Sequence, residues 1–271
     1  MDLHGKVAVV TGGARGIGRG IAVALARQGV HVAVADLYLP SQGTAGYALS
    51  TEQEVMKTVE ELTVLGVKAI GVPVDVTQAA QLEAMVETVT RQLGPIDILC
   101  NNAGVLDTGL VVETTEAQWD AIMDVNVKGV FLGCKAVIPG MVERRQGRII
   151  NTASIAGKRG TARLGAYCAS KFAVVGFTQS LAHEMAPHNV TVNAVCPGIL
   201  GTAMWLDVLM PQRVEPSGRD WHTAFEEHAA SLIPLGRPQT PEDVGQAVVY
   251  LAQADNVTGI ALNVAGGLVM H

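Results

Sequence analysis

Short runs of β-branched and other apolar residues alternate along the chain with longer segments whose apolar positions recur every three or four residues. The short runs predict buried strands, and the longer segments predict helices with one apolar face. The predicted strands are residues 6–10, 31–35, 69–74, 96–100, 148–152, 191–196 and 261–264. The predicted helices are residues 16–28, 51–65, 78–93, 115–145, 165–185 and 241–253.

This alternation predicts an α/β fold: a Rossmann-like, doubly wound parallel sheet with helices on both faces. No stretch rich in proline, serine or charge divides the chain, so we expect one domain over residues 1–271. Two segments are predicted to be loops. The first, residues 37–50, follows the second strand, and the second, residues 204–235, is expected to form a lid over a substrate. Thr51 and Glu54 predict a capping box at the start of the second helix.

Composition narrows the class of protein. Hydrophobic residues make up 49% of the chain and charged residues 16%, with a formal net charge of −6. Disordered proteins have lower hydrophobicity and higher net charge, and nucleic-acid binders are basic, so neither class fits. No apolar run approaches a membrane span, and no segment has the pattern of a signal peptide. The four cysteines form no CxxC pair and the seven histidines no ligand-like cluster, so we expect a cytoplasmic protein with reduced thiols and no metal.

A glycine-rich segment lies between the first predicted strand and the first predicted helix. Gly12 permits a tight turn, Gly16 lets the backbone approach a pyrophosphate, and Gly18 lets the helix pack closely on the sheet. The first N–H groups of that helix would then face an anion. The spacing GxxxGxG differs from the strict GxGxxG, but its place between a strand and a helix predicts a dinucleotide site that includes Arg15 and Ile17.

Asp36 ends the second predicted strand, 18 residues after Gly18. A carboxylate at this place accepts hydrogen bonds from the adenosine ribose and repels a 2′-phosphate. Arg15 could instead favour a 2′-phosphate. We give Asp36 priority because it lies where the ribose is expected, so the sequence predicts NAD rather than NADP.

Tyr167 and Lys171 are four residues apart on a predicted helix and therefore share one face. A free tyrosine has a pKa of about 10, and a nearby ammonium favours the phenolate. The pair is thus a candidate proton-transfer unit. Ser154 directly follows the fifth predicted strand, and Asn126 lies in the long helical region before it. The ends of parallel strands face one crevice, so these side chains are expected to meet there.

With these residues the sequence resembles the classical short-chain dehydrogenase/reductase family. The match consists of Thr11-Gly12-x-x-x-Gly16-x-Gly18, Asn101-Asn102-Ala103-Gly104, Asn126, Ser154, Tyr167-x-x-x-Lys171, and Pro197-Gly198 with Thr202. The resemblance implies an oxidoreductase of class EC 1.1.1 that transfers hydride between a nicotinamide cofactor and a secondary alcohol or ketone. Tyr167 would be the acid/base, Ser154 would bind the substrate oxygen, Lys171 would lower the Tyr167 pKa and bind the nicotinamide ribose, and Asn126 would position a water.

The resemblance also implies further contacts to the cofactor. Asp75, with Val76 beside it, would reach the adenine, and residues 102–104 would line the adenosine side. The nicotinamide would be held by the turn after the sixth strand. These additional cofactor-binding residues are Asp75, Val76, Asn102, Ala103, Gly104, Pro197, Gly198, Ile199 and Thr202.

The substrate and the assembly are less sharply indicated. The stretch 197–205 resembles acetoin and diol dehydrogenases of the family, which suggests a small diol, polyol or hydroxyketone, with Trp205 and Trp221 as candidate pocket walls. Lys158, Arg159 and Arg163 follow Ser154 and could meet an anionic substrate, although charges on loops are usually solvated. The family resemblance implies a homotetramer.

Two alternatives stay open. An NADP-dependent 3-oxoacyl reductase would share the motifs but bind NADPH more tightly than NADH, and Asp36 counts against it. A non-catalytic NAD-sensing protein would bind NAD without turnover. The intact Ser154, Tyr167 and Lys171 count against that alternative.

Overall fold

The computed structural model describes residues 1–38, 49–209 and 221–271, apart from the side chains of Val208, Trp221 and His222. Its strands form one parallel sheet in the order β3-β2-β1-β4-β5-β6-β7. The strands are β1 (Val7–Thr11), β2 (His31–Asp36), β3 (Ala69–Pro73), β4 (Ile98–Asn101), β5 (Gly147–Thr152), β6 (Val190–Pro197) and β7 (Ala261–Val264). The predicted fold class is therefore confirmed.

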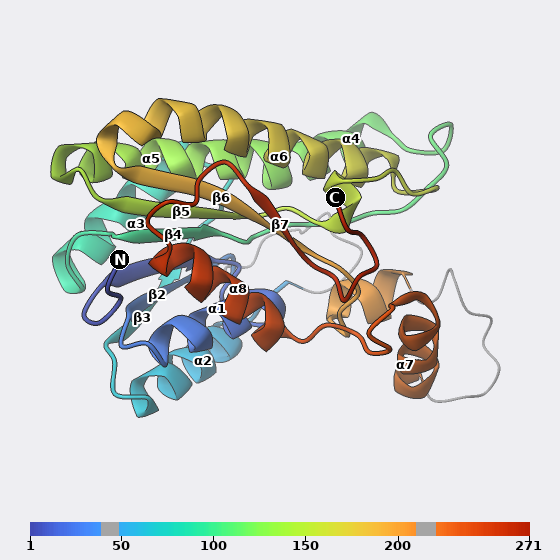
Figure 1. Ribbon diagram of the computed structural model, residues 1–271, viewed down its shortest axis with the longest axis horizontal. Coiled ribbons are helices and arrows are strands. Elements are labelled where there is room, and N and C mark those ends of the chain that lie inside the picture. The colour runs from blue at the N-terminus through green and yellow to red at the C-terminus, as the bar shows by residue number, and fades with distance from the viewer. Residues whose placement is uncertain (39–48, 210–220) are drawn as a thin grey trace.

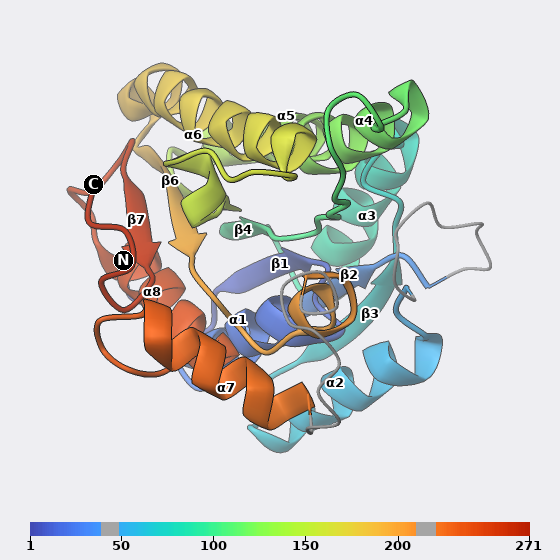
Figure 2. The same ribbon diagram turned by 90° about the vertical axis from the view of Figure 1, so that its right-hand side faces the viewer.

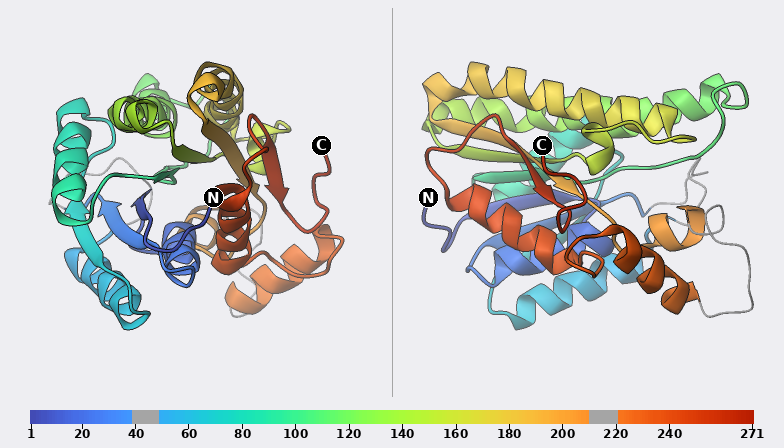
Figure 3. Two further views of the ribbon diagram at one scale, coloured as in Figure 1. Left: turned by 60° about the vertical axis from the view of Figure 1, so that its left-hand side comes forward. Right: turned by 45° about the vertical axis from the view of Figure 1, so that its right-hand side comes forward.

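Helices cover both faces of this sheet (Figures 1 and 3). The α-helices are α1 (Gly16–Ala26), α2 (Glu52–Val64), α3 (Ala79–Gln92), α4 (Glu116–Met123), α5 (Gly129–Arg144), α6 (Gly165–Met185), α7 (Trp221–Leu232) and α8 (Pro241–Gln253). One core packs the sheet against α3, α5 and α6, and a second packs it against α1, α2 and α8. Strand β1 is apolar on both faces of the sheet: Val7 and Val9 are part of the first core, whereas Ala8 and Val10 are part of the second.

The strand order reverses between β1 and β4. The chain runs from β1 outward to β3, then returns to build β4 to β7 on the other side of β1. In such a sheet the ligand crevice lies beyond the carboxyl ends of the strands at this reversal. Figure 2 looks toward this edge, where α7 and the turn Met204–Leu209 lie in front of the sheet.

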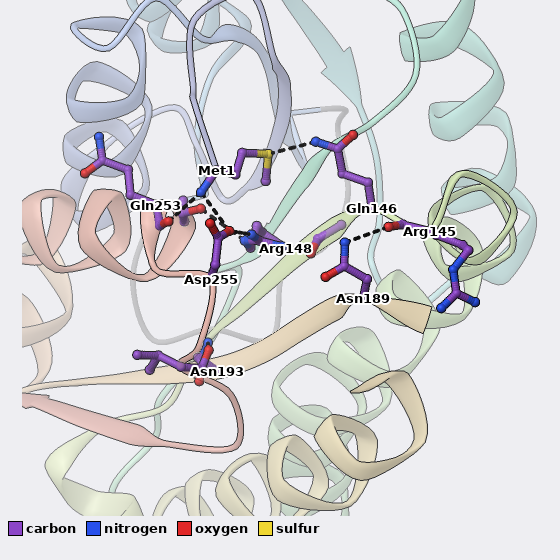
Figure 4. A network of polar contacts seen from close by, with 11 residues as sticks. Met1, Arg145, Gln146, Arg148, Asn189, Asn193, Gln253 and Asp255 are labelled. Atoms are coloured by element: carbon purple, nitrogen blue, oxygen red, sulfur yellow. Dashed lines mark hydrogen bonds and ion pairs between the residues drawn. The ribbon is translucent and has the colours of Figure 1, made fainter. Parts of the chain in front are cut away.

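A polar network lies at the amino-terminal ends of the strands, opposite the crevice (Figure 4). The N-terminal ammonium group of Met1 and the guanidinium of Arg148 both contact the carboxylate of Asp255. Arg148 is buried at the start of β5, and its Nε donates a hydrogen bond of 3.1 Å to the carbonyl of Ala252 in α8. This network therefore joins the first residues, β5 and the end of α8 on the side away from the crevice.

The predicted long helical region over residues 115–145 is present, but the prediction misses a π-helical turn within it. The chain forms α4, then a π-helical turn over Asp124–Lys128, then α5. A π turn holds one extra residue, and such turns are frequent at functional sites. Here the turn carries the fully buried Asn126, whose amide hydrogen-bonds both backbone groups of Val105.

The predicted loop over residues 204–235 is also partly wrong, because it contains the π-helical turn Met204–Leu209 and α7. Within and just after α7, Phe225, Ala229 and Ile233 form a small core with Ile199. Most of the predicted loop 37–50 lies outside the described residues. The predicted capping box is confirmed: Glu54 N donates to Thr51 Oγ1 at 3.2 Å, and Thr51 N donates to Glu54 Oε2 at 2.8 Å.

Candidate active site

A cavity of about 600 Å³ opens at the carboxyl edge of the sheet. The structure brings nearly all of the predicted site residues to its wall. They are Gly12, Arg15, Gly16, Ile17, Gly18, Asp36, Asp75, Val76, Asn102, Ala103, Gly104, Ser154, Tyr167, Lys171, Pro197, Gly198, Ile199 and Thr202. Asn126 alone of the predicted set is not at the wall.

The glycine-rich loop at one end of the cavity has the backbone that an anion site needs. Gly12 and Gly16 have φ angles of +63° and +54°, a region that disfavours residues with a side chain. A Cβ placed on Gly18 would lie 2.0 Å from the carbonyl oxygen of Gly12, so only glycine fits this packing. The residue before α1, Arg15, provides no side-chain cap for the first N–H groups of the helix. These N–H groups can therefore receive a phosphate.

The mostly buried carboxylate of Asp36 is held at the same end of the cavity. Its Oδ2 accepts a hydrogen bond of 2.9 Å from Ala14 N, and its Oδ1 accepts one of 2.9 Å from Leu37 N. Burial raises the pKa of this carboxyl, and the two backbone donors and nearby Arg15 oppose the rise. Arg15 lies 3.8 Å from Glu54, measured from Nη1 to Oε1. The positive charge of Arg15 thus has a carboxylate partner within the protein.

The exit of β4 is fixed against the glycine-rich loop by Asn102. Its Nδ2 donates to the carbonyls of Thr11 and Gly12 at 3.0 and 3.1 Å. The hydroxyl of Thr11 in turn accepts hydrogen bonds from Asn102 N and Ala103 N at 2.9 and 3.1 Å. These bonds hold the backbone of residues 102–104 in the cavity wall.

Ser154, Tyr167 and Lys171 all line this cavity. The Oγ of Ser154 accepts a hydrogen bond of 3.1 Å from Ala156 N, which caps a short 3₁₀ turn over Ile155–Gly157. The Nζ of Lys171 donates to the carbonyl of Thr152 at 2.8 Å and lies 5.6 Å from the centroid of the Tyr167 ring. Burial lowers the pKa of Lys171 to about 8. The arrangement places a buried cation near a buried phenol, which is suited to proton transfer.

Asn126 lies one layer behind the wall, where its side chain is fully engaged. Its Oδ1 accepts a hydrogen bond of 2.8 Å from Val105 N, and its Nδ2 donates to Val105 O and Ser170 Oγ at 2.9 and 3.0 Å. Ser170 donates to the carbonyl of Tyr167 at 2.7 Å. A Cβ on Gly104 would lie 3.2 Å from Asn126 Oδ1 and 3.5 Å from Lys171 Nζ. The Asn126 side chain therefore braces the wall between Gly104 and α6.

Apart from Trp205, which the sequence offered as a candidate pocket wall, sequence reasoning missed the supporting and apolar residues of the site. Ser170 and Thr152, which hold Tyr167 and Lys171, carry no motif of their own. Leu106, Ala156, Leu164 and Leu209 line the cavity and form an apolar cluster with Tyr167 and Cys168, packed against Met204 and Trp205. Trp205 lines the cavity, and its ring lies 6.2 Å from that of Phe225. The side chain of Trp221 lies outside the described residues.

Residues 1–38, 49–209 and 221–271 contain neither a candidate metal site nor a candidate membrane span. No group of histidine, cysteine and carboxylate side chains there could hold a metal ion. No described helix is both long and apolar enough to cross a bilayer. The four cysteines are free and buried, and burial raises the pKa of Cys100 and of Cys134 to about 12.

The chain is similar to a known protein family and to several characterised relatives. The family model described as short chain dehydrogenase matches residues 6–211. The chain is 41% identical over 269 residues to L-2,3-butanediol dehydrogenase of Corynebacterium glutamicum, covering 98% of this chain and 99% of the relative. It is 37% identical to the 3-oxoacyl-[acyl-carrier-protein] reductase of Vibrio cholerae serotype O1 over the whole of both chains.

The structure of this chain is also similar to two solved structures. Carveol dehydrogenase from Mycobacterium avium, in complex with NAD, has a TM-score of 0.90 and 30% identity over 98% of both chains. A single-residue variant of actinorhodin polyketide ketoreductase, with NADPH, has a TM-score of 0.87 and 37% identity over 97% of both chains. One of these structures holds NAD and the other NADPH, so similarity alone does not select the cofactor.

Proposed function

The chain belongs to the short chain dehydrogenase family, and from that membership we propose that it is an NAD-dependent enzyme that oxidises a secondary alcohol or reduces the corresponding ketone. The observation that carries the proposal is the meeting of Ser154, Tyr167 and Lys171 in the cavity that also holds the glycine-rich loop. A phosphate site and a proton-transfer unit in one cavity fit hydride transfer between a dinucleotide and a carbon–oxygen bond.

The residues at the loop end fit a dinucleotide. Uncapped N–H groups at the start of α1 would receive the pyrophosphate, and the Asp36 carboxylate would accept hydrogen bonds from the adenosine ribose. Lys171 would bind the nicotinamide ribose, and Pro197, Gly198, Ile199 and Thr202 would hold the nicotinamide. When bound, the nicotinamide ring accepts or donates the hydride.

The side chains of this chain then supply orientation and the proton. In the oxidation direction Ser154 Oγ hydrogen-bonds the substrate oxygen and holds it near the phenol of Tyr167. The phenolate oxygen of Tyr167 takes the hydroxyl proton, and in the reverse direction the phenol returns it. The ammonium of Lys171, 5.6 Å from the ring centroid, favours the phenolate. Asn126 is a positioning residue that keeps Gly104 and α6 in place.

NAD is preferred over NADP in this proposal because of charge. A 2′-phosphate would approach the Asp36 carboxylate, and Arg15, the cation best placed to compensate, already has Glu54 at 3.8 Å. The second candidate, an NADP-dependent 3-oxoacyl reductase, is favoured by the 3-oxoacyl reductase and NADPH ketoreductase relatives. Steady-state kinetics with NADH and NADPH decide between them, since the second candidate requires a higher kcat/KM with NADPH.

The test of the proposal is Tyr167→Phe, assayed by NAD⁺ reduction over a panel of diols, polyols, hydroxyketones and hydroxy acids. Loss of a general acid/base lowers turnover by about 10²- to 10⁴-fold, while NADH binding, followed by calorimetry, is expected to stay within threefold. A wild-type protein that binds NADH but turns over no secondary alcohol or ketone would instead support the NAD-sensing alternative.

We further propose a single-domain, cytoplasmic homotetramer. Phe131 on α5 and Phe172 on α6 are 46% and 47% exposed, and the Phe131 ring packs edge-on against Phe177 at 6.3 Å. Large aromatic side chains exposed on neighbouring helices suit helix packing between subunits. Light scattering coupled to size-exclusion chromatography measures the mass of the assembly, and a monomer would refute this part of the proposal.

A further inference from the structure

Resting on the proposed function, we propose that Arg159 selects substrates, and that the secondary alcohol or ketone of this enzyme carries a carboxylate. Five charged side chains line the described part of the cavity. They are Arg15, Asp36, Asp75, Arg159 and Lys171. Among the described residues, the other four have partners within the protein, whereas Arg159 is in no ion pair.

Four of the five charges are already engaged within the protein. Asp36 accepts two backbone hydrogen bonds, Asp75 accepts hydrogen bonds from Thr77, Arg15 has Glu54, and Lys171 donates to the carbonyl of Thr152. None of the ion pairs between described residues includes Arg159. Arg159 is exposed and lines the cavity, and it has no carboxylate partner in the described part of the chain.

The backbone of Arg159 is fixed beside the catalytic tyrosine. Arg159 N donates to the carbonyl of Ile155 at 3.2 Å, and its carbonyl accepts a contact of 4.0 Å from the thiol of Cys168, the residue after Tyr167. The intervening turn packs tightly on α6, since a Cβ on Gly157 would lie 2.6 Å from the carbonyl oxygen of Lys171. Arg159 thus has a rigid base and an exposed, adaptable side chain at the cavity wall.

The neighbouring charges and surfaces define what this cation can bind. Lys158 and Arg163 add positive charge within the same loop, and both carboxylates of the cavity, Asp36 and Asp75, are assigned to the adenosine end. The wall beside Tyr167 includes an apolar cluster. A guanidinium fork pairs with a carboxylate through two hydrogen bonds, and a positive loop attracts anions from solution. A hydroxy or oxo acid matches these features: its carboxylate would pair with Arg159 in the positive loop. A short apolar spacer between its carboxylate and its hydroxyl or oxo group would lie against the apolar cluster.

The test compares acids with their uncharged counterparts. Hydroxy acids with the hydroxyl two to five carbons from the carboxylate are assayed beside their methyl esters, with butane-2,3-diol as a further neutral probe. The wild type is expected to prefer at least one acid over its ester by tenfold or more in kcat/KM. This preference should shrink as NaCl rises, because the pair at an exposed guanidinium is screened.

Three variants separate a specific contact at Arg159 from a general effect of the positive loop. Arg159→Gln is expected to lower the acid-to-ester preference at least tenfold, mainly through KM for the acid, and Arg159→Lys to restore part of it. Arg163→Gln removes the same charge from the same loop, but Arg163 does not line the cavity, so the preference should change less than twofold.

The possible results also separate this inference from the proposed function. Turnover of esters and the diol at least as fast as of every acid, or equal losses for acid and ester in Arg159→Gln, overturns the role of Arg159 and leaves the proposed function standing. Absence of turnover with every acid, ester and diol, together with NADH binding, overturns both.

Discussion

The buried ammonium of Lys171 should make the stability of the protein depend on pH in a specific way. Burial lowers the pKa of Lys171 from 10.5 to about 8, and the side chain is only 4% exposed. Lowering the pKa of Lys171 from 10.5 to about 8 corresponds to about 3 kcal/mol of unfavourable free energy for the charged form in the folded state. Below pH 8 the lysine is charged in both states, and this cost is present in full.

The cost fades as pH rises from about 8 to 10.5, because the folded state loses its proton before the unfolded state does. In that window the unfolded chain binds more protons, so stability rises with pH. The linkage relation gives a cost of about 3 kcal/mol at pH 7 and about 1 kcal/mol at pH 10.

Lys171→Met removes this titration, and urea unfolding of the cofactor-free proteins measures it. The free energy of unfolding of the variant minus that of the wild type is expected to fall by about 2 kcal/mol between pH 7 and pH 10. The lost hydrogen bond to Thr152 shifts this difference by a constant and does not affect its slope. Lys135→Met, at an exposed position on α5, is the matched control and should give a flat difference. A flat difference for Lys171→Met would refute a buried, destabilised ammonium.

Three further substitutions test other parts of the site. Asp36→Ala removes the carboxylate that would face a 2′-phosphate, so the ratio of kcat/KM with NADPH to that with NADH should rise at least tenfold; an unchanged ratio would show that Asp36 does not select the cofactor. Gly18→Ala would place a methyl group 2.0 Å from Gly12 O, so calorimetry should show NADH affinity at least tenfold weaker. Gly176→Ala, where a methyl group meets nothing within 4 Å, is its control and should keep the wild-type affinity. Asn126→Ala leaves the partly buried backbone groups of Val105 without partners, so urea unfolding should show a loss of about 2–3 kcal/mol; a loss below 0.5 kcal/mol, about the size of a surface substitution, would contradict the bracing role.

The sheet and its two cores were predictable because their signals are local. Helices α6 and α8 and strand β7 have the predicted bounds, since each is a continuous apolar pattern with clear ends. The π turn at Asn126 was not predictable, because it depends on hydrogen bonds to Val105, 21 residues away in the sequence. Helix α7 was missed for a similar reason: its apolar residues are organised by contact with Ile199 rather than by a strong pattern of their own.

The same contrast divides the cavity into a half that sequence motifs describe and a half that they do not. The cofactor half is built from backbone, and backbone geometry demands particular residues, such as glycine at positions 12, 16 and 18. The other half is built from side chains of the turn after Ser154 and from Met204, Trp205 and Leu209. The motifs that identify the family therefore lie in the first of these halves, and we expect the residues that select the substrate to lie in the second. Within that second half a leucine changes only shape, whereas Arg159 adds a charge that an uncharged substrate would leave uncompensated, which is why this residue offers the sharpest test of what the enzyme binds.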